Sequence, residues 1–484
     1  MRAWLTLLIA IGLASLLSAP AQSESSSQDV LVVLGGTLID GTGSQPRPIA
    51  AIEIRNGSFT QIVPAGTRYE APDGALRIDA RGRTVVPGIW DMHVHLGADD
   101  EASLRANLGA LLASGVTGAL STSDPTDLIV AVRERLRARE LSGPRVFTCG
   151  ASITPPGGHP GPYVRLITGT KDDPLASRPG PLAGSPEDSR QAVRNRVGKK
   201  VDAIKLIIED GPPFSHKAET ARMSYEVAAA AVSEARAAGL PVFAHVSSSA
   251  EAKDAVRAGV RGLVHSIVED EMDEELLADL RSRGVGYVTT LSLYEGLLEF
   301  TGPDAPWDDP FLARWVAPRE LTESRDPAFL SRLAPLVAWA GAGISPARSN
   351  LRRALDSGLT VALGTDVGNP FVFHGYATHR ELAALARAGI DPVQVVRIAS
   401  LEGARLLGVE DRYGSVEVGK AADLLVLELD PTRELAEAYR RIFTIVQDGK
   451  LVDVSSLPLP ATSPAGSFHR SRELGPPAQQ GALQ

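Results

Sequence analysis

The segment Val85–Gly97, VVPGIWDMHVHLG, is an apolar, strand-like run that ends in two histidines one residue apart. Side chains two residues apart in a β-strand point to the same face, so His93 and His95 would point the same way. One cation could then bind both imidazoles. Two buried histidines satisfied by hydrogen bonds are the alternative, and this segment alone does not decide between them.

Apolar runs of strand length alternate with helical patterns through residues 87 to 407. Several of the helical patterns end at a glycine, as the C-terminus of a helix favours. Eight such strands alternating with helices predict an α/β fold, a (β/α)8 TIM barrel. A doubly wound parallel sheet is the competing fold, but no glycine-rich phosphate turn follows the first strand.

Two β-rich segments, residues 30–86 and 408–455, flank this central region. The pair Asn56-Gly57 stands between two alternating runs, which is a hairpin signal. The pieces IRNGSFTQIV and IVQDGKLVDV share a strand–turn–strand pattern. We therefore expect both chain ends to join in one small β domain.

The chain begins with a positive charge at Arg2, an apolar run and the small-residue segment SAPAQ. This pattern predicts a secretory signal peptide over residues 1–21 and export to the periplasm or the medium. An uncleaved N-terminal anchor is the alternative. No other segment approaches the length of a membrane span, so we expect no membrane attachment after cleavage. Residues 456–484 are rich in Pro, Ser, Gly and Gln and predict a disordered tail.

The overall composition is that of a globular protein, with 484 residues of which 44% are hydrophobic. The formal charge is −9 and no basic patch occurs, so nucleic acid is not expected as a partner. Cys149 is the only cysteine, which excludes an intramolecular disulfide and favours a packing role. The sequence does not set the oligomeric state, and a homo-oligomer stays open.

Polar side chains occur at or near the carboxyl ends of five predicted strands, where a barrel enzyme places its reacting groups. Five of the six are standard metal-ligand types. Their convergence on one rim favours a metal site over separately satisfied histidines. The six residues are His93, His95, Lys205, His245, His265 and Asp366.

Lys205 stands between Ile204 and Leu206, in a strand that a barrel covers on both faces. A buried ammonium is unfavourable unless it is paired or neutralised. A lowered pKa would leave a neutral amine that can react with CO2, and the resulting carbamate can bridge two cations. A lysine that reaches solvent or Glu209 is the alternative.

The segments PGIWDMHVHLG, GSVEVGKAADLLVLELDP and RIFTIVQDGKLV are similar to segments of the amidohydrolase superfamily, whose members are metal-dependent hydrolases. The first resembles the HxH signature of that superfamily, and the others resemble its return into a β-sandwich. The resemblance covers residues 30 to 455. It implies a (β/α)8 barrel over 87–407 and a composite β-sandwich from 30–86 and 408–455.

The segment ITPPGGHPG resembles the glycine-glycine-histidine loop of the imidazolonepropionase and prolidase-like branch. This resemblance implies that His159 contacts substrate and helps to stabilise the oxyanion, although Pro160 stands where a glycine is common. An exposed loop residue is the alternative for His159. Imidazolonepropionase-type members lack the lysine of the fourth strand and use one metal. Lys205 therefore indicates the two-metal dipeptidases and N-acyl amino acid hydrolases of this branch.

The resemblance implies two divalent cations, and imidazole and carboxylate ligands favour zinc. A hydroxide held between the cations would attack the amide carbonyl, while Asp366 carries the proton to the departing nitrogen. The implied ligands are His93, His95 and Asp366 for one cation, His245 and His265 for the other, and carboxylated Lys205 as the bridge.

The sequence thus predicts an exported, binuclear hydrolase of small amides, either dipeptides or N-acyl amino acids. Hydrolysis of cyclic amides or imides is one alternative, and metal binding without turnover is another. The predicted insertions 160–190 and 294–326 follow strand ends and should lie over the site. They would act as lids or bind the carboxylate and side chain of the substrate.

Overall fold

The computed structural model describes residues 30–98, 100–169, 182–210 and 220–461. The predicted signal peptide and all but the first residues of the predicted tail lie outside the described residues. Leu457 is buried in the main core, so the packed chain extends slightly beyond the predicted start of the tail.

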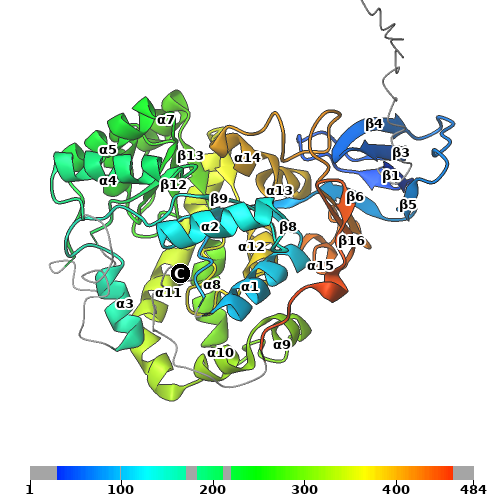
Figure 1. The fold of residues 1–484 in the computed structure, drawn as a ribbon. Coiled ribbons are helices and arrows are strands. Elements are labelled where there is room, and N and C mark those ends of the chain that lie inside the picture. The colour runs from blue at the N-terminus through cyan, green and yellow to red at the C-terminus, as the bar shows by residue number, and fades with distance from the viewer. Residues whose placement is uncertain (1–29, 99, 170–181, 211–219, 462–484) are drawn as a thin grey trace, which may run out of the picture.

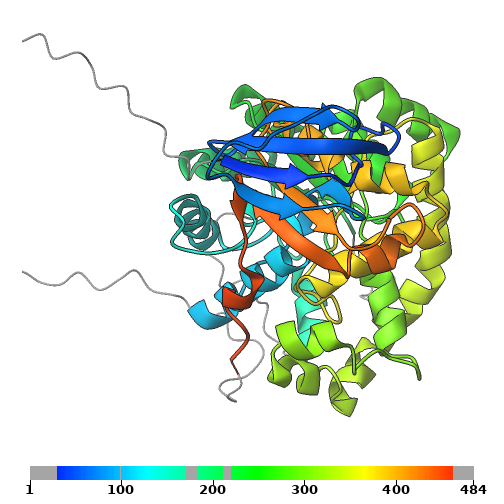
Figure 2. The same ribbon diagram turned by 90° about the vertical axis from the view of Figure 1, so that its right-hand side faces the viewer.

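Strands from both ends of the chain form one sheet (Figures 1 and 2). Its order is β17-β16-β15-β6-β2-β3-β1-β5, and β4 pairs with β3. The two ends meet where β15 pairs antiparallel with β6, with Val426 opposite Val85. The strands are β1 (Val30–Leu34), β2 (Thr37–Leu38), β3 (Arg47–Arg55), β4 (Ser58–Pro64), β5 (Leu76–Asp79), β6 (Thr84–Pro87), β15 (Leu424–Leu427), β16 (Ile442–Gln447) and β17 (Lys450–Leu451).

Alternating apolar residues bury both faces of β1. Leu31 and Val33 belong to one buried cluster, whereas Val30 and Val32 belong to another. This division follows from the two-residue period of a strand. Burial on both faces agrees with the predicted β-sandwich, while the sandwich itself and its bounds stay predictions.

Eight further strands run parallel to one another in chain order. Hydrogen bonds divide these strands into two groups. Isolated bridges, Ile153 with Leu206 and Val94 with Val367, join the two groups at both of their ends. The arrangement is consistent with the predicted barrel. The strands are β7 (Ile89–Val94), β8 (Val116–Ser121), β9 (Arg145–Thr148), β10 (Ile204–Ile207), β11 (Val242–His245), β12 (Gly262–Val264), β13 (Gly286–Val288) and β14 (Val361–Ala362).

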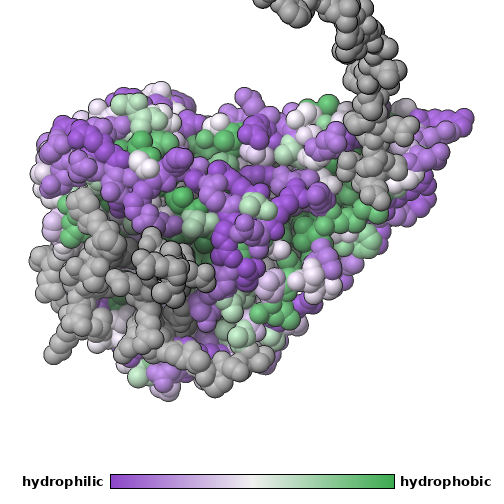
Figure 3. All heavy atoms as spheres, in the orientation of Figure 1, coloured by the Kyte–Doolittle hydropathy of each residue, from purple (hydrophilic) through white to green (hydrophobic). Residues whose placement is uncertain are grey.

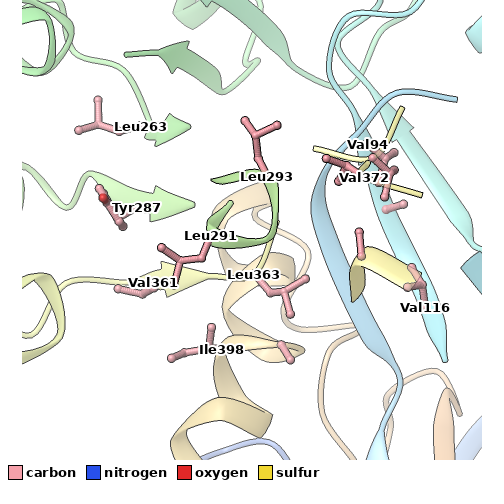
Figure 4. Close-up of a cluster of buried hydrophobic side chains, with 14 of the residues drawn as sticks. Val94, Val116, Leu263, Tyr287, Leu291, Leu293, Val361, Leu363, Val372 and Ile398 are labelled. Carbon is pink, nitrogen blue, oxygen red and sulfur yellow. The ribbon is translucent and has the colours of Figure 1, made fainter. Parts of the chain in front are cut away.

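Two layers of buried side chains surround these strands. A small cluster takes side chains from, or next to, each of the eight strands, and its members include Trp90, Cys149, Phe243 and Val288. This is the filled interior expected of a barrel. A larger cluster lies between strands and helices, and Figure 4 shows part of it around Tyr287. Cys149 therefore packs in the interior, and burial raises its pKa to about 12.

Helices connect and cover the strands (Figure 1). Local signals set their ends: the Ser248 side chain and Glu251 form a capping box at the start of α6, and Gly259 ends it in a left-handed conformation. The helices are α1 (Glu101–Ala113), α2 (Thr126–Arg137), α3 (Gly161–Thr168), α4 (Pro186–Gly198), α5 (Tyr225–Ala237), α6 (Ser249–Ala258), α7 (Glu274–Arg283), α8 (Leu291–Phe300), α9 (Pro310–Trp315), α10 (Pro318–Glu323), α11 (Pro327–Asp356), α12 (Tyr376–Arg387), α13 (Pro392–Ile398), α14 (Leu401–Leu407), α15 (Leu435–Ala438) and the 3-10 helix Val454–Ser456.

The described residues of the predicted insertion 160–190 include helical segments, so a fully loop-like reading was wrong. Helix α3 begins there with a proline in its first turn and ends at Gly169, whose φ is 69°. Proline at the start and left-handed glycine at the end are both favourable helix boundaries. Hydrophilic side chains cover much of the face shown in Figure 3, with hydrophobic patches between them.

Candidate metal centre

The six predicted strand-end residues converge on one side of the parallel strands. Lys205 lies in β10 two residues after the interior residue Ala203, and His245 ends β11 two residues after Phe243. Each therefore points to the interior face of its strand. The other four residues are His93 within β7, His95 just after it, His265 directly after β12, and Asp366 after β14.

The Asp366 carboxylate lies at the centre of three imidazoles. Its Oδ1 atom is 2.8 Å from Nε2 of His95 and 3.3 Å from Nε2 of His93. Its Oδ2 atom is 3.8 Å from Nδ1 of His265. Donor atoms of His93, His265 and Asp366 lie within 4.8 Å of one another, a spacing that one cation can span. The structure thus brings His93, His95 and Asp366 together as predicted, and it also places His265, predicted for the second cation, beside Asp366.

The imidazoles continue as a row across the site. The ring centroids of His93 and His265 are 4.5 Å apart, those of His265 and His245 are 4.1 Å apart, and those of His245 and His159 are 4.7 Å apart. Burial lowers the pKa of His245 to about 3 and that of His159 to about 4, and it places the pKa values of His93 and His265 well below the usual value. Neutral imidazole is the form that binds metal ions.

Lys205 is only 2% exposed, and its Nζ atom has no hydrogen-bond partner within the described part of the chain. Burial lowers its pKa to about 8, which increases the share of neutral amine. His93 Nδ1 is likewise buried, with no hydrogen-bond partner among the residues that the structure describes. Orphaned buried donors beside neutral imidazoles and a carboxylate fit divalent cations and a carbamate on Lys205.

Glu209 is a site residue that the sequence analysis missed as a candidate ligand. It is 2% exposed, its Oε2 atom contacts Nε2 of His245, and it lies 3.5 Å from Nδ1 of His159. These three residues form a second group whose donor atoms lie within 4.8 Å of one another. Its signal in the sequence was an acidic residue just after the strand that carries Lys205, which we considered only as a partner of that lysine.

Two of the site residues adopt an unusual backbone conformation. The φ angle is 77° at His265 and 64° at Asp366, in the left-handed region that disfavours residues other than glycine, asparagine and aspartate. Asp366 is held there by its own N–H, which donates to the His93 carbonyl, and by Asn369 Nδ2, which donates to the Asp366 carbonyl at 3.0 Å. Strained conformations of this kind cluster at functional sites.

Helix α3 reaches the site through Tyr163. Its ring stacks on His159 with centroids 5.5 Å apart, and its hydroxyl donates to Asn369 Oδ1 at 3.0 Å. The predicted insertion therefore does contact the candidate metal centre, and the Tyr163 hydroxyl links it to the segment that carries Asp366.

A buried carboxylate, Asp91, accepts hydrogen bonds beside the pair His93 and His95. Asp91 is fully buried, and it accepts hydrogen bonds from the backbone N–H of His93 at 3.1 Å, the backbone N–H of Thr365 at 3.0 Å and the Thr365 hydroxyl at 2.6 Å. Burial raises the pKa of Asp91 to about 7. The side chain thus links β7 to the segment after β14, which carries Asp366.

We expect Asp91→Ala to lower the free energy of unfolding by about 3 kcal/mol, because it leaves the buried donors of His93 and Thr365 without an acceptor. Urea titration followed by circular dichroism measures the change. Asp79→Ala, at an exposed carboxylate, is the matched control and should change the value by less than about 0.5 kcal/mol. Equal effects of the two substitutions would contradict the linking role of Asp91.

A model of the amidohydrolase family matches residues 84–455, more than half of the chain. The chain belongs to the amidohydrolase family. This confirms the resemblance seen in the sequence, and with it the prediction of a hydrolase that acts on carbon–nitrogen bonds. The family assignment argues against metal binding without turnover.

Relatives of this amidohydrolase extend over most of its length. It is 27% identical over 449 residues to an ochratoxinase of Aspergillus niger, covering 85% of this chain and 84% of the relative. It is 25% identical over 402 residues to an imidazolonepropionase of Micrococcus luteus, covering 80% and 89%. A crystal structure of a Xaa-Pro dipeptidase with methionine in its active site matches with a TM-score of 0.72 and 25% identity, covering 87% and 99%.

Proposed function

We propose that this amidohydrolase is an exported, binuclear enzyme that cleaves the amide bond of dipeptides or N-acyl amino acids. The observation that carries the proposal is the convergence of Lys205, Asp366 and the histidine row on one rim of the parallel strands. The likeness to a Xaa-Pro dipeptidase supports a dipeptide or related amide as the substrate class. Export rests on the predicted signal peptide over residues 1–21.

The proposed division of ligands follows the order of the strands. His93, His95 and Asp366 would hold one cation, and His245 and His265 the other, with carboxylated Lys205 between them. Zinc suits this set of nitrogen and oxygen donors. Bound divalent cations would polarise the amide carbonyl and lower the pKa of water at the site.

The side chains supply the proton transfer. Asp366 would accept a proton from the attacking water and deliver it to the departing nitrogen. Its position suits this role because it is nearly buried and its Oδ1 atom is 2.8 Å from His95 Nε2, which limits its rotation. His159, at the end of the histidine row and under the ring of Tyr163, would donate to the developing oxyanion.

Cyclic amides are the second candidate substrate class, since an imidazolonepropionase matches 80% of the chain. The buried Lys205 favours the first candidate, because imidazolonepropionase-type sites are expected to lack this lysine. A panel of dipeptides, N-acyl amino acids and lactams, assayed with zinc and bicarbonate, separates the two. Turnover of the lactams alone would replace the first candidate by the second.

Removal of metal should abolish turnover of the panel. We expect dialysis against a chelator to lower the rate at least about 100-fold and zinc with bicarbonate to restore it. Elemental analysis should count two zinc ions per chain in the restored protein. Full activity in protein free of metal would contradict the proposed function.

A further inference from the structure

The side-chain amide of Asn369 joins two parts of the site that lie far apart in the sequence. Its Nδ2 atom donates to the backbone carbonyl of Asp366 at 3.0 Å, and its Oδ1 atom accepts from the Tyr163 hydroxyl at 3.0 Å. The Tyr163 ring stacks on His159, with centroids 5.5 Å apart and planes inclined by 29°. One amide therefore contacts the residue assigned to proton transfer and, through one ring, the residue assigned to the oxyanion.

These contacts fix the amide in one orientation. A carboxamide has one donor end and one acceptor end. Rotation by 180° would turn its oxygen toward the carbonyl oxygen of Asp366, which offers no proton. The backbone of Asn369 is held as well, because its carbonyl accepts from the Val372 N–H at 3.0 Å in a tight turn. Asn369 thus presents both ends of its side chain from a fixed place.

Asp366 is a residue whose backbone needs such support. Its φ of 64° lies in the left-handed region, which is unfavourable for a residue that carries a Cβ atom. Its N–H donates to the His93 carbonyl at 2.8 Å, and Asn369 holds its carbonyl. The direction of a side chain follows from the conformation of its backbone. The contact with Asn369 therefore helps to set where the carboxylate points.

Helix α3 is held at its far end independently of the site. Arg332, from α11, donates through Nε to the carbonyl of Ile167 at 3.1 Å, close to the C-terminus of α3. The hydrogen bond between Tyr163 and Asn369 joins the first turn of the same helix to the loop that carries Asp366. Loss of that bond should loosen the first turn and leave the far end in place.

We propose that Asn369 is a positioning residue that holds Asp366 and His159 in fixed places relative to each other. This inference rests on the proposed function. In that reaction the water oxygen bonds to the carbonyl carbon, the C–N bond breaks, and the water proton passes through Asp366 to the nitrogen. The two residues act on neighbouring atoms of one substrate, so their relative position sets the rate. An asparagine that only stabilises the loop would make the same contacts, and the tests separate the two roles.

A pair of matched substrates tests the contact with Asp366. Asn369→Leu keeps the branched shape of the side chain and removes both hydrogen bonds. We expect kcat on the best amide of the panel to fall about 10- to 100-fold, with KM and metal content close to wild type, because the proton carrier is misplaced. On the thioester in which sulfur replaces the departing nitrogen, the loss should be about tenfold smaller, because a thiolate leaves without a proton.

Asn195→Leu, at an exposed asparagine of α4, is the matched control and should equal wild type on both substrates. Equal losses on the amide and the thioester in Asn369→Leu would reduce the effect to general damage and overturn the proposal.

Tyr163→Phe isolates the contact on the side of His159, because it keeps the ring and removes only the hydroxyl. It should lower kcat at most about tenfold, and equally on amide and thioester, since both substrates form the oxyanion. In an Asp366→Asn background, Asn369→Leu should cost no more than Tyr163→Phe costs in the wild type, because the proton carrier is already lost. A further loss as large as in the wild type would show that Asn369 acts independently of Asp366 and overturn the proposal.

Amide hydrogen exchange tests the contact with Tyr163 without any turnover. The N–H of Val164 is hydrogen-bonded in the first turn of α3. It should exchange about fivefold faster in Tyr163→Phe and in Asn369→Leu, as loss of one hydrogen bond implies. The N–H of Gly169, at the end held by Arg332, is the internal control and should not change. Unchanged exchange at Val164 in both variants would overturn the proposal.

The two kinds of measurement separate this inference from the proposed function. Wild-type turnover of the amide with wild-type kinetics in Asn369→Leu would overturn the inference alone. A wild type that hydrolyses no substrate of the panel would overturn the proposed function, and the inference with it, whatever the exchange rates in α3.

Discussion

Lys205→Ala should lose at least one of the two cations and lower kcat/KM about a thousandfold, or about 4 kcal/mol of transition-state stabilisation. The reason is that the alanine side chain cannot form the carbamate that would bridge the cations. Elemental analysis of the purified variant and steady-state assay on the best amide of the panel measure the two effects. A wild-type metal count and a wild-type rate in Lys205→Ala would contradict the proposed carbamate.

Chemical rescue separates the lost carbamate from general damage. A short-chain carboxylic acid such as propionate should enter the space left in Lys205→Ala and restore part of the metal and rate. Lys205→Met is the matched control, because its side chain fills that space without an amine. In the metal-free form it should be at least as stable as wild type, since burial of the unmodified amine carries a desolvation cost. Rescue of both variants alike would contradict the assignment.

Asp366→Asn should keep much of its metal and lose between about 10²-fold and 10⁴-fold in kcat. Asparagine retains an oxygen that can face His95 and the cation, but it cannot accept the proton. It is also the best replacement for the backbone, because asparagine tolerates the left-handed conformation found at φ 64°. Metal analysis and single-turnover kinetics measure the two quantities separately.

The exposed Asp411→Asn serves as a control for loss of a carboxylate and should match wild type in both measurements. Loss of all metal together with activity in Asp366→Asn would show that the carboxylate acts as a ligand rather than in proton transfer. Retention of both metal and activity in Asp366→Asn would contradict the ligand role as well as the proton-transfer role.

Much of this arrangement could be predicted from the sequence, because the two-residue period of a strand fixes the face to which each side chain points. The strand period placed His93 and His95 on one face, and the order of the apolar runs placed Lys205, His245 and Asp366 with them at one rim. The β-rich ends also pair as expected, since Val85 and Val426 lie in neighbouring strands. These features depend on local pattern and strand order, which a single sequence contains.

Contacts that depend on three-dimensional approach could not be predicted. Glu209 reaches His159 across about fifty residues of chain, and Asp91 reaches Thr365 across a far longer separation. No periodicity connects such pairs. The helix α3 was missed because glycine and proline dominate its surroundings, although those residues act there as its boundaries.

The pairing of β15 with β6 has a consequence for how the enzyme matures. Only Gly88 separates β6 from β7, the strand that carries His93. The partner strand of β6, β15, is made more than three hundred residues later. A nascent chain in which β15 has not yet been made leaves one edge of β6 unpaired, next to the strand that carries the first histidines. The strand that carries His93 should therefore reach its final position only after β15 has been made and has paired with β6.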